Sequence, residues 1–139
     1  MASIKISTGL KVYDIEDEHG NVRGQVSFNP ADMGFYERAR NFYDEMQTLI
    51  DSIENDESLQ EADKVIEADK RMKERLNELF DDPNASAVVF GNQNCFNTLN
   101  GITFVERFLN AFMPIIKDEF AKEKKKSDKR IEKYMKVIK

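Results

Sequence analysis

The stretch that decides the fold is residues 29–53, NPADMGFYERARNFYDEMQTLIDSI. Asn29 can cap a helix, Pro30 suits the first helical position, and Asp32 offers a second cap. Apolar side chains then recur every three or four residues, with charged residues between them. They are Phe35, Tyr36, Ala39, Phe42, Tyr43, Met46, Leu49, Ile50 and Ile53. The stretch therefore predicts an amphipathic helix over about residues 32–54 that buries one broad face.

Before this helix, the pattern changes to the alternation that is typical of β-strands. Branched apolar residues recur through residues 4–15, and the alternation returns in residues 22–28. The polar residues 17–21, DEHGN, lie between the two runs and predict a turn. Gly9 inside the first run suggests a further turn or a bulge. We therefore expect an antiparallel β-hairpin over about residues 3–28.

After the first helix, two more helices are predicted, over about residues 58–80 and 102–120. The apolar positions of the first are Leu59, Ala62, Val65, Ile66, Met72, Leu76, Leu79 and Phe80. Those of the second are Phe104, Val105, Phe108, Leu109, Phe112, Ile115, Ile116 and Phe120. Pro114 predicts a kink or a local break in the second helix, because proline removes a backbone donor. Between the helices, residues 85–90 fit a short helix or a strand, and the polar residues 92–101 predict a long surface loop.

The charge is unevenly distributed along the chain. The net charge is −5, yet residues 117–139 contain ten Lys or Arg and only five Asp or Glu. Within this basic segment, apolar residues return at helical spacing, at Ile131, Tyr134, Met135 and Ile138. We therefore expect an α+β fold with a single domain over residues 1–120, followed by a basic amphipathic helical tail over residues 121–139. Such a tail is a docking element or a tether.

Residues that commonly carry catalysis are few and scattered. His19 lies in the predicted turn with no nucleophile or second ligand at a fixed spacing. Cys95 has no neighbouring cation or histidine to activate its thiol. The acids around the turn lack the ligand spacing of a calcium loop; they are Asp14, Glu16, Asp17 and Glu18. We expect no enzymatic activity, no cofactor and no metal.

The single cysteine fits a reducing compartment, and no run of about 18 apolar residues or signal-peptide pattern occurs. These features predict a cytoplasmic protein without a membrane partner. The basic tail has three interpretations: a solvated helical face, a docking helix for an acidic partner surface, or a nucleic-acid site. Its consecutive lysines at 124–126 point in different directions around a helix, and nearby acids dilute their field. We therefore expect no nucleic-acid partner.

Several short motifs resemble one family of phage proteins. They are FNPAD at residues 28–32 with Phe35, Glu37 and Arg38 after it, VFG at 89–91, the apolar run at 104–116, and RIEKY at 130–134. Together they resemble the tail-assembly chaperones of siphophages and prophages of Gram-positive bacteria. The resemblance implies a non-catalytic protein of the host bacterial cytoplasm. It also implies that the protein self-associates and coats the tape-measure protein, or another tail component, before the tail tube polymerises.

A chaperone of this kind needs amphipathic docking surfaces. The predicted protein-binding residues combine the apolar helix with the tail: Phe108, Phe112, Ile116, Phe120, Ile131, Tyr134, Met135 and Ile138. The stripe of Phe104, Phe108 and Phe112 also suits a hydrophobic core. Two other functions stay open: a minor structural or connector protein that remains in the virion, and a small hydrolase or nuclease of a mobile element. The last requires clustered carboxylates that bind a metal ion.

Overall fold

The computed structural model describes the backbone of residues 2–54 and 61–138, and the side chains of residues 2–53 and 62–126. A hairpin comes first, formed by β1 (Lys11–Glu16) and β2 (Val22–Phe28). Then follow α1 (Met33–Glu54), α2 (Glu61–Phe80), α3 (Ala85–Phe90), the short strands β3 (Thr98–Leu99) and β4 (Ile102–Thr103), and α4 (Phe104–Ile138). The predicted α+β class, with an N-terminal antiparallel hairpin before the helices, is confirmed.

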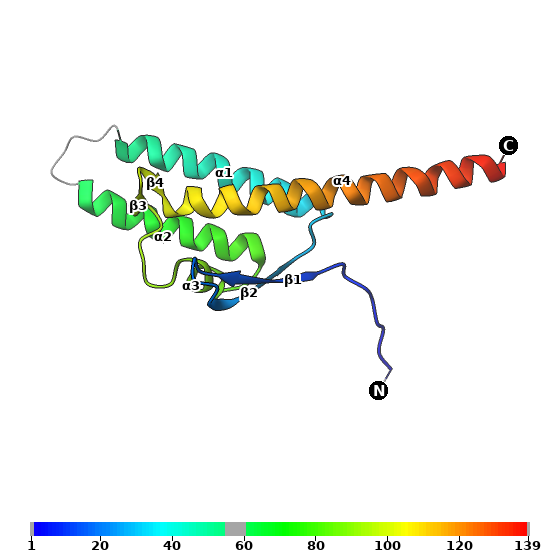
Figure 1. Cartoon of the computed structure of the whole chain (residues 1–139), viewed down its shortest axis with the longest axis horizontal. Coiled ribbons are helices and arrows are strands. Elements are labelled where there is room, and N and C mark those ends of the chain that lie inside the picture. Colours follow the sequence, from blue (N-terminus) through cyan, green and yellow to red (C-terminus); the bar gives the residue numbers. More distant parts are fainter. Residues whose placement is uncertain (1, 55–60, 139) are drawn as a thin grey trace.

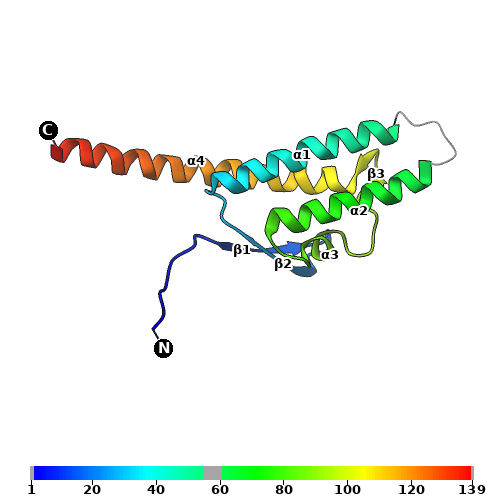
Figure 2. The same ribbon diagram turned by 180° about the vertical axis from the view of Figure 1, so that it is seen from behind.

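The three long helices lie side by side along the long axis of the molecule (Figures 1 and 2). The hairpin and α3 lie against one side of this helical layer, and the last part of α4 runs on beyond it. Aromatic rings join the two layers. Phe28 of β2 stacks on Tyr13 and Phe35, at centroid distances of 4.7 and 4.8 Å. It also meets the rings of Phe80 and Phe112 edge-on. Rings from five elements therefore form one continuous core.

The first helix confirms the predicted buried face but begins slightly later than its first capping signal. Asp32 is its N-cap, because Asp32 Oδ1 accepts a hydrogen bond of 2.9 Å from the backbone N–H of Gly34. Asn29 and Pro30 form the preceding turn, in which Asn29 Oδ1 accepts a 3.0 Å hydrogen bond from the N–H of Ala31. The fully buried members of the face are Phe35, Ala39, Phe42 and Met46.

The second helix is confirmed over residues 61–80, whereas predicted residues 58–60, including Leu59, lie outside the described part of the chain. Its later apolar positions are buried as expected: Met72, Leu76, Leu79 and Phe80. The expectation for its first turns was wrong, since Ala62 and Ile66 are exposed and Ala68 is buried instead. Residues 85–90 form a helix, so the alternative of a strand there is excluded.

The predicted surface loop at residues 92–101 is partly core. Cys95 and Phe96 are buried, and the segment ends in the β3–β4 hairpin. Asp69 of α2 holds it in place, because Asp69 Oδ1 accepts a 2.8 Å hydrogen bond from the N–H of Cys95. The carbonyl of Cys95 in turn accepts a 2.8 Å bond from the N–H of Val105. The partners come from distant segments, which is why the polar composition of the loop did not reveal its burial.

The first strand is shorter than predicted, because it begins at Lys11 and not near residue 3. Residues 2–10, which we call the N-terminal arm, form no strand. The side chains of Ile4 and Ile6 are 89% and 77% exposed. A strand needs a neighbour for its backbone groups, and the arm runs away from the hairpin (Figure 1). The alternating pattern is present, but its pairing partner is missing from the described chain.

The last helix is continuous from Phe104 to Ile138, so the break predicted at Pro114 does not occur. Proline removes the hydrogen bond to the carbonyl of Asn110, and both residues are exposed, so water can replace the lost donor. The predicted boundary at residue 120 therefore falls inside one helix. We call residues 104–120 the packed half of α4 and residues 121–138 its projecting half.

The start of α4 contains a helix-capping signal that hydrophobic periodicity alone does not detect. The sequence TFVE at residues 103–106 is a capping box. Thr103 Oγ1 accepts a 3.2 Å hydrogen bond from the N–H of Glu106, and Glu106 Oε1 accepts bonds from the N–H and the hydroxyl of Thr103. The box fixes the first turn of α4 directly after β4.

Candidate functional site: a groove between β1 and α4

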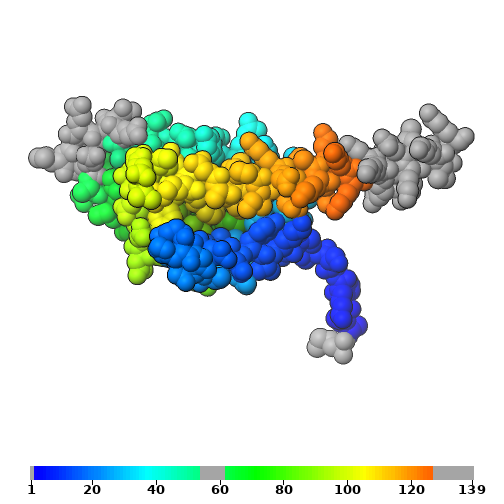
Figure 3. Space-filling model, in the orientation of Figure 1, coloured from blue at the N-terminus to red at the C-terminus, as the bar shows by residue number. Residues whose placement is uncertain are grey.

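A groove of about 830 Å³ separates the hairpin from the packed half of α4. In Figure 3 the hairpin (blue) and α4 (yellow) lie on either side of it. Its floor is apolar, because core residues reach the surface at this place. The apolar lining residues are Tyr13, Ile15, Val26, Phe28, Val89, Leu99, Phe104, Phe108, Ala111, Phe112 and Ile115. A concave apolar surface of this size is suited to binding another molecule.

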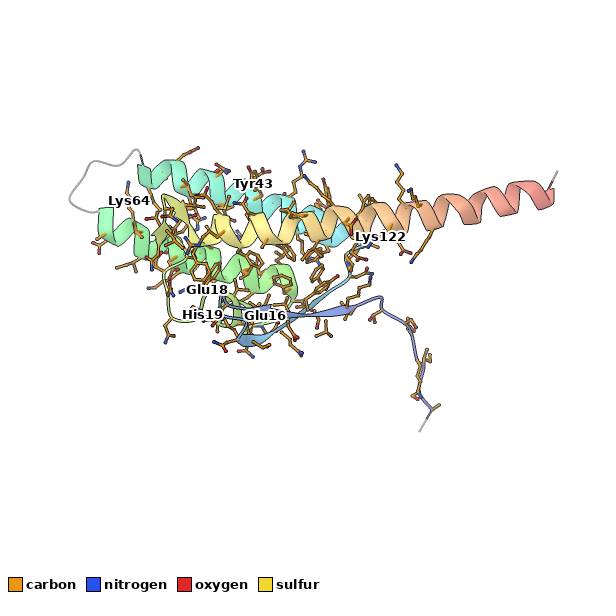
Figure 4. All side chains as sticks on the ribbon, viewed as in Figure 1. Glu16, Glu18, His19, Tyr43, Lys64 and Lys122 are labelled. Atoms are coloured by element: carbon orange, nitrogen blue, oxygen red, sulfur yellow. The ribbon has the colours of Figure 1, made fainter. Side chains whose placement is uncertain are left out.

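The rim of the groove on the hairpin side is acidic. Its carboxylates come from β1 and the following turn: Asp14, Glu16, Asp17 and Glu18. Figure 4 shows Glu16, Glu18 and His19 at the turn end of the hairpin. Asp17 holds this turn, because its carboxylate accepts hydrogen bonds from the backbone N–H groups of Asn21 and His19. The Asn21 bond is the largest of the causes that lower the pKa of Asp17.

Two arginines also line the groove, and both are engaged by their own chain. Arg23 donates from Nε to the carbonyl of Val88 at 3.3 Å. Arg107 donates from Nη1 to the carbonyl of Ile102, and its guanidinium lies 5.0 Å from the centroid of the Phe104 ring. Four carboxylates against two engaged guanidinium groups leave the groove with an excess of negative charge. It therefore favours a partner segment that combines apolar and basic side chains.

One ion pair links β1 to α4 outside the groove lining. Lys11 Nζ at the start of β1 lies 2.7 Å from Glu119 Oε2 of α4. Their hydrogen bond raises the pKa of Lys11 and lowers the pKa of Glu119. Next to it, Phe120 stacks on Tyr36 of α1 with the ring centroids 6.0 Å apart. Beyond these contacts, the described side chains of α4, at residues 121–126, are all exposed.

The groove also exposes backbone hydrogen-bonding groups. Within the described residues, the sheet that contains β1 has only two strands, so β1 pairs with β2 along one edge only. Every residue from 13 to 18 lines the groove, so β1 and the following turn border it. On the opposite side of the hairpin, α3 packs against β2. The free edge of β1 is therefore the sheet edge at which an additional strand can pair.

The structure separates the predicted binding residues into three groups. Phe112 and Ile116 are buried, Phe108 and Phe120 are partly buried, and the side chains of Ile131, Tyr134, Met135 and Ile138 lie outside the described part of the chain. Phe112 and Ile116 therefore belong to the core and do not form an exposed docking face. Phe108 and Phe112 do line the floor of the groove. Sequence reasoning missed its other wall, formed by Tyr13, Ile15 and Phe28, because only the tertiary fold brings the hairpin opposite α4.

The two residues that were considered for catalysis lie in different surroundings. Cys95 is fully buried, and this burial raises the pKa of its thiol, so the sulfur is held as a neutral thiol at physiological pH. His19 is exposed in the turn, beside Glu18. Among the described residues, no group of three or more His, Cys, Asp or Glu side chains is arranged to hold a metal ion.

Comparison with known proteins adds no relative. A scan against protein-family models finds no match, and searches of curated proteins and of solved structures find none either. The resemblance to tail-assembly chaperones therefore stays a prediction from the short motifs. Within residues 2–54 and 61–138, no helix has the length and the apolar composition that a membrane crossing requires.

Proposed function

We propose that this protein is a non-catalytic protein-binding module of phage tail assembly, which chaperones the tape-measure protein before the tail tube polymerises. The observation that carries the proposal is the projecting half of α4. Residues 121–126 are all exposed, and the helix continues to Ile138 beyond the other helices (Figure 1). A helix that leaves its own domain in this way is available to dock on a partner.

The sequence of the projecting half suits a helical partner. Ile131, Tyr134, Met135 and Ile138 recur at positions i, i+3, i+4 and i+7, and basic residues occupy most of the positions around them. Amphipathic helices of this pattern bind in apolar grooves or pair with other amphipathic helices. A tape-measure protein, which is long and helical, offers such surfaces repeatedly. The motif resemblance supports this partner over others. Because phage tails assemble inside the host, we expect the interaction to occur in the host bacterial cytoplasm.

Ion pairs within the described part of α4 support the proposal that α4 binds as a preformed, rigid helix. Lys122 Nζ lies 3.1 Å from Asp118 Oδ2 and 3.8 Å from Glu119 Oε1, one helical turn earlier. Pairs at this spacing stabilise the helix at the point where it leaves the body. A helix that is already formed loses less conformational entropy on binding than a disordered segment does.

The proposal expects a long, helical tape-measure protein to be encoded just downstream of this gene. The test is co-expression of the two proteins, followed by measurement of their affinity. Tyr134→Asp combined with Ile138→Asp should weaken the complex at least about tenfold, since two apolar contacts are replaced by charges. Ile66→Asp is the matched control, because Ile66 is exposed on α2 and carries the same change. Absence of a complex with the unaltered chain, or equal affinity of the double variant and the control, contradicts the proposal.

A connector protein that stays in the virion is the alternative function. Mass spectrometry of purified particles separates the two. A chaperone should be absent from the particles, whereas a connector should be present in a fixed stoichiometry.

A further inference from the structure

We infer that residues 3–7 of the N-terminal arm pair, as an additional β-strand, with the free edge of β1 in a second copy of this chain. The protein then self-associates through the groove between β1 and α4. This inference concerns a different surface from the projecting half of α4 and does not depend on the proposed function.

The arm has the sequence of a strand without the neighbour that a strand needs. In SIKIS, residues 3–7, isoleucine alternates with polar residues, which is the pattern of a half-buried strand. Both isoleucines are nevertheless more than three-quarters exposed, at 89% for Ile4 and 77% for Ile6. Two large apolar side chains that are exposed on one extended segment are typical of a segment that binds elsewhere.

The free edge of β1 supplies the missing neighbour. Tyr13 and Ile15 are partly buried and turn toward the core, whereas Asp14 and Glu16 are exposed on the outer face. The apolar floor of the groove continues beside Tyr13 and Ile15. An added strand would hydrogen-bond to the free backbone groups of β1 and would cover this floor with every second side chain.

The two segments are complementary in pattern and in charge. The arm reads Ile4-Lys5-Ile6 and β1 reads Tyr13-Asp14-Ile15, so each has a charged residue between two apolar ones. When the isoleucines face the floor, Lys5 falls on the outer face with the carboxylates of β1. A shift by one residue would place Lys5 on the aromatic floor, so the register is specified. Pairing of two β1 edges is disfavoured, because it would bring their carboxylates together.

The pairing occurs between copies because the arm is directed away from its own β1 edge. The carbonyl of Thr8 accepts a 3.3 Å hydrogen bond from Asn29 Nδ2, at the end of β2. At Gly9, φ is +76°, and a Cβ there would lie 2.7 Å from the same nitrogen. The chain therefore passes closely along Asn29 on the β2 side, and the arm leaves the hairpin from there (Figure 1). A second copy has the same free edge, so two chains can exchange arms.

The first test is the oligomeric state of the full chain, measured by sedimentation over a range of concentrations. The unaltered protein should self-associate, and Ile4→Asp with Ile6→Asp should weaken the association by about tenfold or more for each isoleucine. The double variant should still fold, since both side chains are exposed within one chain. Ile66→Asp again serves as the matched control, with unchanged association.

The second test is amide hydrogen exchange in residues 4–7. Protection of these amides should rise with protein concentration and should be lost in the double variant. A chain that stays monomeric at all concentrations, or protection that does not depend on concentration, overturns the inference. Association that survives the double variant but disappears on removal of residues 127–139 also overturns it. Tape-measure binding should be retained by the double variant, so failure here and failure of the proposed function are distinguishable.

Discussion

The body of the molecule and its N-terminal arm use similar apolar side chains in opposite ways. In the body, the rings of Phe28, Phe35, Phe80 and Phe112 contact one another and are buried. In the N-terminal arm, Ile4 and Ile6 are exposed, and the projecting half of α4 begins with residues that are all exposed. If the proposed contacts form, stability and association are located in separate regions of the chain. Substitutions in the body should change the free energy of unfolding, whereas substitutions at the ends should change binding alone.

The largest effect is expected for Phe28→Ala in the middle of the core. Phe28 contacts four other aromatic rings, so its removal leaves a cavity that several elements border. The free energy of unfolding should fall by about 3–5 kcal/mol in a urea titration. Ile4→Asp with Ile6→Asp, measured at a concentration where the chain is monomeric, should change it by less than about 0.5 kcal/mol. Equal losses for both changes would erase the distinction between body and arm.

A smaller loss is expected for Thr103→Ala at the start of α4. The change removes the hydroxyl that accepts the hydrogen bond from the N–H of Glu106. Loss of a helix cap of this kind costs about 1 kcal/mol of stability, again measured by urea titration. Thr98→Ala, at an exposed position in β3, is the control and should have no measurable effect. An unchanged stability in Thr103→Ala would mean that α4 is held by its packing alone.

A still smaller, pH-dependent effect is expected for Glu119→Gln, at the boundary between the packed and projecting halves. The hydrogen bond from Lys11 lowers the pKa of Glu119 in the folded chain below the ordinary value of a glutamate. The ion pair therefore stabilises the fold above the ordinary pKa of a glutamate, and this contribution is lost as the pH falls through the lowered pKa. Because the pair is solvent-exposed, added salt should weaken it.

The measurement is the thermal midpoint as a function of pH at low salt. The difference between Glu119→Gln and the unaltered chain should be present near neutral pH and should vanish in acid. Glu74→Gln removes a charge from an exposed position on α2 and should show no such trend. A constant difference at every pH would assign the effect to something other than the Lys11 pair.

The smallest effect on stability is expected for removal of residues 127–139. The helix has left the body by residue 121, so the free energy of unfolding should stay within about 0.5 kcal/mol of the full chain. Binding of the tape-measure protein should nevertheless be lost. A truncated chain that is clearly destabilised would show that the projecting half is part of the body.

Sequence patterns revealed some residues of the candidate site but not their arrangement in space. The apolar character of Phe108 and Phe112 was readable from their helical spacing, but their spacing does not say whether they face a partner or the core. Ile15 belonged to the predicted alternating run, and Tyr13 was not singled out. Their position opposite α4 follows from the packing of Phe28 between the layers, which no local pattern contains. The groove was therefore not predictable, although several of its apolar residues were recognised as members of their elements.

By itself, the sequence determined the hairpin turn, the amphipathic faces of α1 and α4, and the caps at Asp32 and Thr103, because these depend on side chains and backbone groups only a few residues apart. The tertiary structure decided features that need distant partners. Cys95 is buried because Asp69 of α2 holds its N–H, and β1 stops at Lys11 because the arm lies outside the sheet. The helix continues through Pro114 because that turn faces solvent. Local hydrogen bonding and hydrophobic periodicity determine each helix and strand. Tertiary packing then determines which side chains are buried and which strands pair.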